Sequence, residues 1–318
     1  MSWLTWRQHR WEAASALLLL LVLCVCVVLL TVAGSGLLAE ISRNCEPTSQ
    51  SVVATTCGSL SSEYSSSFQS AWWWVAAAGT VIPAFVGVFV GAPLVARELE
   101  SGTHLLIWAQ GITRRRWFLS AIGLVVLGTV GSTALLAAAS QGWFAMQRGL
   151  GSAGSLSVWD GFEVGPPVLI AYALFGLALG VAAGVVIRRT VPAMAATLVV
   201  FIGVRIAVAL LARPLYLSPL AARANFGGQS GSYFGTGGPA PSDWLVGAPL
   251  LVDGAGHPIP SGGFCLGSGA GCYPQIFAIQ HYQPAARFWL FQGIEAAIFV
   301  VLALVLFALA YRLVMRMR

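Results

Sequence analysis

Six long apolar stretches constrain the fold of this chain more than any other feature. A helix needs about 20 residues to cross the hydrocarbon core of a membrane. Only 9% of the residues are charged, whereas about a quarter are charged in a soluble domain. The sequence therefore predicts an all-α integral membrane protein with six transmembrane helices. The stretches lie between Glu12 and Glu40, at 71–95, at 117–143, between Glu163 and Arg188, at 191–211 and at 288–311.

The first stretch follows two arginines, Arg7 and Arg10, as a secretory signal would. Its apolar run is much longer than the 7–15 residues of a cleaved signal, so we expect a retained helix. Residues 1–12 are predicted to form an interfacial helix. Its tryptophans can lie at the level of the lipid headgroups; they are Trp3, Trp6 and Trp11.

The arginines predict the orientation of the chain, because positive charge is retained on the cytoplasmic side. With the N-terminus inside, the inner segments hold eleven arginines and three acids, and the outer segments hold five arginines and seven acids. Both termini are therefore expected in the cytoplasm. The predicted parts are the interfacial helix 1–12, helices one to five in 13–211 with a cytoplasmic loop at 96–116, an extracellular segment 212–286, and the last helix with a cytoplasmic tail, 287–318.

The extracellular segment 212–286 is dense in Gly and Pro and predicts a small cap with little helix. A hairpin is expected from Trp244 to Val252, turning at Asp253-Gly254 and returning toward Ile259. Four cysteines fall in outer segments, where disulfides persist. Four cysteines allow three pairings, of which the local pairs are the simplest: Cys45–Cys57 and Cys265–Cys272.

Small residues recur at four-residue spacing in two helices. Gly176, Gly180 and Gly184 form such a stripe in the fourth predicted helix, where it favours close helix packing in lipid. Gly87 and Gly91 repeat the spacing in the second, but a pair can also arise by chance in a glycine-rich chain.

Catalytic motifs are missing from the sequence. The chain has no lysine and hence no phosphate-binding loop of the Gly-x-x-x-x-Gly-Lys type. It also lacks a His-Glu-x-x-His pair and a Gly-x-Ser-x-Gly elbow. We expect no enzyme activity, metal site or cofactor in this chain. Nucleic acid is not an expected partner, because the net charge of +6 lies beside apolar runs rather than on a basic face.

The loop between the second and third helices is the most distinctive segment. It reads ARELESGTHLLIWAQGITRRRW over 96–117, with a predicted helix end at Ser101-Gly102 and Thr113 as the N-cap of the next helix. Arg114, Arg115 and Arg116 are accounted for if they keep the loop on the cytoplasmic side of the membrane and contact lipid phosphate groups. A docking surface for a cytoplasmic protein is the alternative.

This loop resembles the first cytoplasmic loop of permease subunits of ABC-2-type transporters, which reads E-x-E-x-G-T followed by Q-x-x-(S/T)-R-x-R-W. The strings TWRQHR and YQPAARFWLFQGIE resemble actinobacterial members, which implies the plasma membrane of a high-GC bacterium. The resemblance implies a separate ATPase subunit carrying ATP and Mg²⁺, a second permease copy or paralogue, and a path lined by the second and fifth helices. It implies an ATPase-coupling role for Glu98, Glu100, Gly102, Thr103, His104, Trp108, Arg114, Arg115 and Arg116, with a coupling helix at 104–109.

Two charges lie inside predicted helices. Arg205 precedes Arg213 by eight residues and Glu295 follows Arg287 by eight, which places both about 12 Å below the outer interface. An isolated charge at such depth costs about 2.5–3.5 kcal/mol, so we expect Arg205 and Glu295 to pair. The pair can hold the last two helices together or line a substrate path.

The leading hypothesis from sequence is the permease subunit of an ATP-driven exporter. The alternative is a membrane sensor or scaffold whose extracellular cap binds a ligand. An intramembrane enzyme is disfavoured, because the apolar stretches hold no paired acids or histidines. A neighbouring ATPase reading frame would distinguish the first two.

Overall fold

The computed structural model describes most of the chain from residue 70 onward. The predicted interfacial helix 1–12 and first membrane helix lie outside the described residues, apart from isolated helical positions between 25 and 36. The described ranges are 70–102, 113–148, 157–225, 238–240, 242–259, 265–266, 272–273 and 275–316.

Within these ranges the chain has five helices long and apolar enough to cross a membrane. They coincide with the second to sixth predicted stretches. The second reaches the predicted helix end at Ser101, and the last continues further than expected, to Arg316. Since the first predicted stretch lies outside the described residues, the total of six stays a prediction. The five candidates are Trp74–Ser101, Phe118–Gly142, Val158–Ile187, Thr190–Leu215 and Ala285–Arg316.

The chain divides into two compact units, which we call the helical unit and the sheet unit. The helical unit comprises Met1–Gly154, Gly161–Val208 and Gln292–Arg318, and the sheet unit comprises Ser155–Asp160 and Ala209–Phe291.

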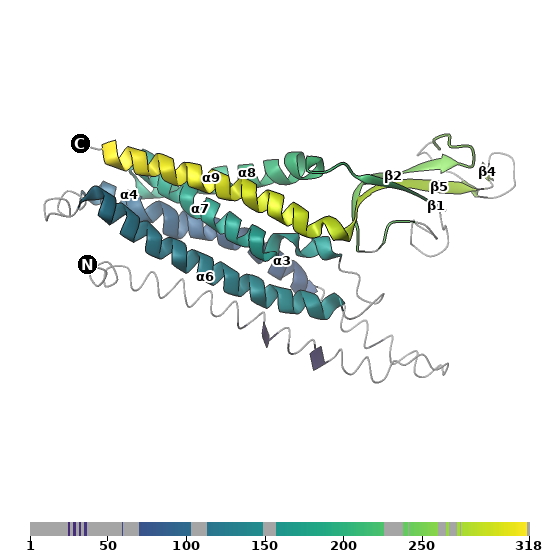
Figure 1. The fold of residues 1–318 in the computed structure, drawn as a ribbon, viewed down its shortest axis with the longest axis horizontal. Helices are drawn as coiled ribbons and strands as arrows, with labels where there is room; N and C mark the ends of the chain where they lie inside the picture. The colour runs from purple at the N-terminus through teal and green to yellow at the C-terminus, as the bar shows by residue number, and fades with distance from the viewer. Residues whose placement is uncertain are drawn as a thin grey trace. The chain divides into compact units, whose positions relative to one another are not determined.

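The helical unit packs its helices side by side (Figure 1). The central helix is α7, since fifteen of its 22 residues are buried, against four of the 18 residues of α8. The elements are α3 (Ser70–Phe85), the π-helical turn η2 (Val86–Gly91), α4 (Ala92–Ser101), α6 (Arg114–Arg148), the 3-10 helix η4 (Val158–Val164, shared with the sheet unit), α7 (Pro166–Ile187), α8 (Thr190–Ala207) and α9 (Phe288–Arg316).

A stripe of glycines brings α7 against α3, η2 and α4. A methyl group added at Gly176 would collide with the carbonyl oxygen of Pro83, and one added at Gly180 with that of Gly87. At Gly184 it would lie 2.8 Å from the carbonyl oxygen of Ala92. The backbones are thus too close for any side chain at these positions, which is the packing that small residues permit in lipid. Gly87 takes part in the same contact.

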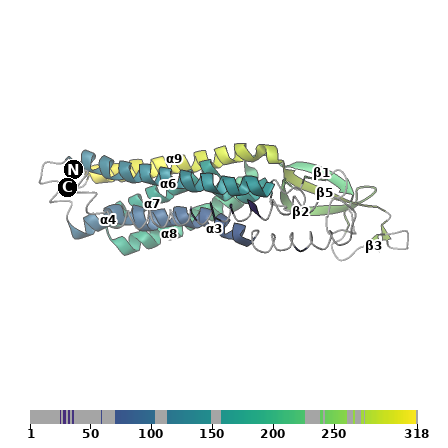
Figure 2. The ribbon, with the colours of Figure 1, turned by 90° about the horizontal axis from the view of Figure 1, so that it is seen from below.

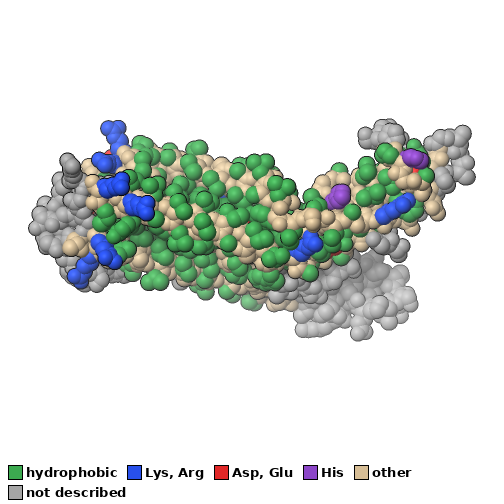
Figure 3. All heavy atoms as spheres, turned by 45° about the horizontal axis from the view of Figure 1, so that its top comes forward, with side chains coloured by type: hydrophobic (Ala, Val, Ile, Leu, Met, Phe, Trp, Pro, Cys, Tyr) green, Lys and Arg blue, Asp and Glu red, His purple; other side chains and the backbone are tan. Residues whose placement is uncertain are grey.

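The surface of the helical unit is apolar along its length and basic at one end (Figure 3). Leu127, Val191 and Val199 are each at least 70% exposed, which suits a surface in contact with lipid rather than water. Figures 1 and 2 place the end of α4, the start of α6 and the end of α9 at the same end of the unit. The arginines at these helix ends and in the α7–α8 turn are Arg97, Arg114, Arg115, Arg116, Arg188, Arg189, Arg312 and Arg316.

The sheet unit is built on three antiparallel strands in the order β1-β5-β2. The central strand β5 (Ile276–Gln283) pairs with β1 (Leu220–Asn225) and with β2 (Trp244–Asp253), and alternate residues of β5 are buried. Sequence analysis expected β2 to turn at Asp253-Gly254 and return toward Ile259. The return exists but is short: Pro258 bridges Val252, and the main partner of β2 is β5, far along the chain.

A bulge interrupts the pairing of β2 with β5 between Val246 and Leu250, where Gly247 adopts φ +73°. The Gln280 side chain is 1% exposed and donates to the carbonyl oxygens of Val246 and Gly247, each at 3.1 Å. The amide thus satisfies carbonyl groups that the bulge removes from the ladder.

Candidate functional sites in the helical unit

A buried charge cluster lies between η4, α7, α8 and α9. Its centre is Arg205 of α8, which is 6% exposed. Arg205 Nη2 forms an ion pair with Glu163 Oε2, and Arg205 Nη1 lies 3.4 Å from Glu295 Oε1. The contact between Arg205 and Glu295 that matched depth predicted is therefore present, and Glu295 is 0% exposed.

Aromatic side chains complete the surroundings of the guanidinium group. Its central carbon lies 3.5 Å from the centre of the Tyr172 ring and 5.8 Å from that of Phe299. The Tyr172 hydroxyl donates to Glu295 Oε1, the oxygen that also faces Arg205. A ring face attracts a cation more strongly when water is excluded, so α7 contributes both a cation–π contact and a hydrogen bond.

Gln292, one turn before Glu295 on α9, holds η4 in place. Its Nε2 donates to the carbonyl oxygen of Phe162 at 2.6 Å, and its side chain is 0% exposed. A methyl group at Gly165 would collide with this amide. The contact fixes the residue before Glu163, and thereby positions the Glu163 carboxylate toward Arg205.

The sequence did not predict Glu163 as a partner of Arg205. The structure places it in η4, directly before α7, with its side chain 24% exposed and paired with Arg205. An Arg side chain is long enough to reach a carboxylate at a different depth in the membrane. A search for charges at equal depth therefore finds Glu295 but not Glu163. The signal available was an acid two residues before the Gly165-Pro166 start of a membrane helix.

The chemistry of the cluster is that of a stabilised ion network. Removing one partner from a buried charge pair leaves the other charge uncompensated, which destabilises the fold by about 3–5 kcal/mol. No group of three or more metal-ligating side chains occurs among the described residues. Because Arg205 and Glu295 are buried, the structure favours a role in holding the helices together over a role in lining a substrate path.

The arginine-rich end of the unit holds those predicted coupling residues that the structure describes. Helix α4 ends at Ser101, and Gly102 adopts φ +72°, the left-handed conformation common after a helix end. The Glu100 carboxylate accepts hydrogen bonds from the backbone N–H of Thr190 at 2.9 Å and from its hydroxyl at 2.7 Å. Glu98 is half-buried. Thr103, His104, Trp108 and the predicted coupling helix 104–109 lie outside the described residues.

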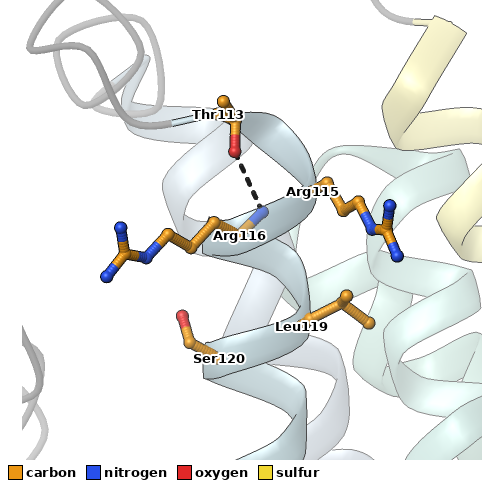
Figure 4. Close-up of a pocket in the computed structure, with 5 residues that line it drawn as sticks. All are labelled: Thr113, Arg115, Arg116, Leu119 and Ser120. Atoms are coloured by element: carbon orange, nitrogen blue, oxygen red, sulfur yellow. Dashed lines mark hydrogen bonds between the residues drawn. The ribbon is translucent and has the colours of Figure 1, made fainter.

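Helix α6 begins behind Thr113, whose hydroxyl accepts the backbone N–H of Arg116 at 3.4 Å. Figure 4 shows an open recess here, with Arg115 and Arg116 pointing to opposite sides of the helix, above Leu119 and Ser120 respectively. Both arginines are exposed. Because the two guanidinium groups point away from each other, they do not form a joint anion-binding site in this arrangement.

Comparison with known proteins assigns the chain to a family. A family model described as ABC-2 membrane transporter related matches residues 17–213, more than half of the sequence. The chain belongs to this family. Neither the curated proteins nor the solved structures include a significant match.

The ABC-2 family match covers the predicted coupling loop and three members of the charge cluster, Glu163, Tyr172 and Arg205. Glu295 and Gln292 lie beyond the matched residues. The resemblance of the loop to ABC-2 permeases is thus confirmed at the family level, and the chain is a multi-pass membrane protein of the transporter permease type.

Of the predicted disulfide cysteines, Cys45 and Cys57 lie outside the described residues. Cys265 of β3 (Cys265–Leu266) lies opposite Cys272 of β4 (Cys272–Tyr273) in a two-stranded parallel pair.

Proposed function

We propose that this chain is the membrane-spanning permease subunit of an ATP-driven exporter and works with a separate ATPase subunit. The family match over residues 17–213 carries the proposal. ATP and Mg²⁺ bind to the partner, and this chain has no catalytic role of its own. A second permease copy or a paralogue completes the path, which the second and fifth predicted helices line.

The proposed orientation places the arginine-rich end of the helical unit in the cytoplasm, with both termini, and the sheet unit outside. The distribution of arginines supports it. In an extracellular sheet unit, the opposed Cys265 and Cys272 would form a disulfide. Reporter fusions test the orientation: an alkaline phosphatase inserted at the exposed turn 254–256 should be active, and one at the C-terminus inactive.

Co-purification tests the function. The chain, expressed with the ATPase encoded beside it and solubilised in detergent, should retain the ATPase and hydrolyse ATP. Arg115→Ala with Arg116→Ala should weaken retention, because both side chains are exposed at the loop-side end. The matched control is Arg223→Ala, an exposed arginine of the sheet unit.

A chain that purifies alone in every nucleotide state would overturn the exporter proposal. It would favour a sensor or scaffold, and the compact sheet unit would then be the candidate ligand-binding part.

A further inference from the structure

Helix α8 begins without a cap of its own. Arg189 precedes it in extended conformation, and its side chain makes no capping hydrogen bond. The first N–H groups of a helix lack partners within the helix, and the dipole makes this end positive. The Glu100 carboxylate, from the last turn of α4, accepts the backbone N–H of Thr190 and also its hydroxyl.

A second contact joins the same helices below the cap. Ala92 and Ala96 of α4 and Ala193 of α8 are each 0% exposed and form one apolar cluster, with Ala183, Ile187 and Met194 packed against it. Small side chains let the two backbones approach closely. The end of α4 and the start of α8 therefore share both a polar and an apolar contact.

Helix α8 connects this contact with the buried charge cluster. Thr190 and Arg205 lie on one continuous helix, fifteen residues apart, or about 22 Å at 1.5 Å per residue. A displacement at Thr190 moves the position of Arg205 unless α8 bends. Arg205 in turn contacts η4 and α9 through Glu163 and Glu295.

We infer that Glu100 is a positioning residue that transmits movement of the cytoplasmic loop from α4 to α8, rather than a contact for the ATPase itself. This inference rests on the proposed exporter function. Glu100 opens the segment that the ATPase would move, and its carboxylate is already engaged by Thr190.

The test measures movement of α8 in the complex with its ATPase. Genetically encoded spin labels at Val191 on α8 and Leu309 on α9, both exposed, report their distance without ATP and with ATP, Mg²⁺ and vanadate. Glu100→Ala should reduce the ATP-dependent shift at least twofold, while ATPase binding and hydrolysis remain. Glu100→Gln, which keeps an acceptor oxygen, should restore most of the shift.

Thr190→Val provides a second variant should Glu100→Ala fail to fold. It removes the hydroxyl contact and keeps the N–H contact, so it should reduce the shift measurably, but by less than Glu100→Ala. A full shift in the folded Glu100→Ala or Thr190→Val protein, with the ATPase bound, would overturn the inference and leave the exporter proposal intact. A loss of ATPase retention in Glu100→Ala alone would assign Glu100 to docking and also overturn it. Failure of the wild-type chain to retain any ATPase would overturn the proposed function and this inference with it.

Discussion

Helix α8 is held at each end by a glutamate from another helix, but the two contacts differ in burial. At one end Glu295 of α9 is 0% exposed and meets Arg205 and Tyr172. At the other end Glu100 of α4 is exposed and meets the first residue of α8. A buried charge costs much when its partner is lost, whereas an exposed one is screened by water. Loss of the contact is therefore expected to lower stability strongly at the buried end and weakly at the exposed end.

The largest effect is expected from Arg205→Ala. It leaves the carboxylates of Glu163 and Glu295 without their shared cation, at a cost of about 3–5 kcal/mol. The yield of monodisperse protein and its thermal stability in detergent should fall sharply. Arg223→Ala in the sheet unit, which removes only exposed contacts, should lower both much less. Normal yield and stability would contradict the assignment of a stabilising role to the cluster.

Glu295→Gln sharpens the distinction between the two roles of the cluster. The amide keeps the shape but loses the charge that Tyr172 and Arg205 contact, so we expect a loss of about 1.5–3 kcal/mol. Expression and thermal stability should therefore fall, though less than for Arg205→Ala. Normal folding with an altered range of transported compounds would instead support a place in the substrate path.

Glu100→Gln should have little effect on stability. The Gln side chain retains an oxygen that can accept the Thr190 N–H, and the site is exposed. Its melting temperature should lie close to that of the wild type and above that of Glu295→Gln. A loss as large as that of Glu295→Gln would show that the two ends of α8 are equally important for folding.

The smallest effect concerns Asp253, a partly exposed carboxylate of the sheet unit. The backbone N–H of His257, which donates to Asp253 Oδ1 at 2.8 Å, lowers the pKa of the Asp253 carboxyl. Since the folded pKa is depressed, the turn is stabilised above the unfolded value of about 3.9 and loses this contribution as pH falls through the folded pKa.

The hydrogen-exchange protection factors of residues 253–259, which correct for the intrinsic pH dependence of amide exchange, should therefore fall at acidic pH in the wild type. In Asp253→Asn the protection factors should show less dependence on pH over that range. An identical pH dependence in both proteins would exclude Asp253 as its source.

Sequence determined those features that depend on short stretches of chain. Apolar runs of sufficient length must cross the membrane as helices, because lipid offers no partner for backbone groups, and five of the six are present among the described residues. The helix end at Ser101-Gly102 and the Thr113 cap were also predictable, since each depends on neighbouring residues. Even the contact of Arg205 with Glu295 followed from their equal depth.

Only the tertiary structure decided the contacts between distant segments, because the spacing of residues in the sequence does not reveal them. Glu163 joins the charge cluster because Gln292 fixes η4 beside α9. Glu100 caps α8 because α4 and α8 pack through small residues. The sheet order β1-β5-β2 likewise places the last strand at the centre. In each case the partner is chosen by packing in three dimensions, and the stability of a buried charge depends on that choice.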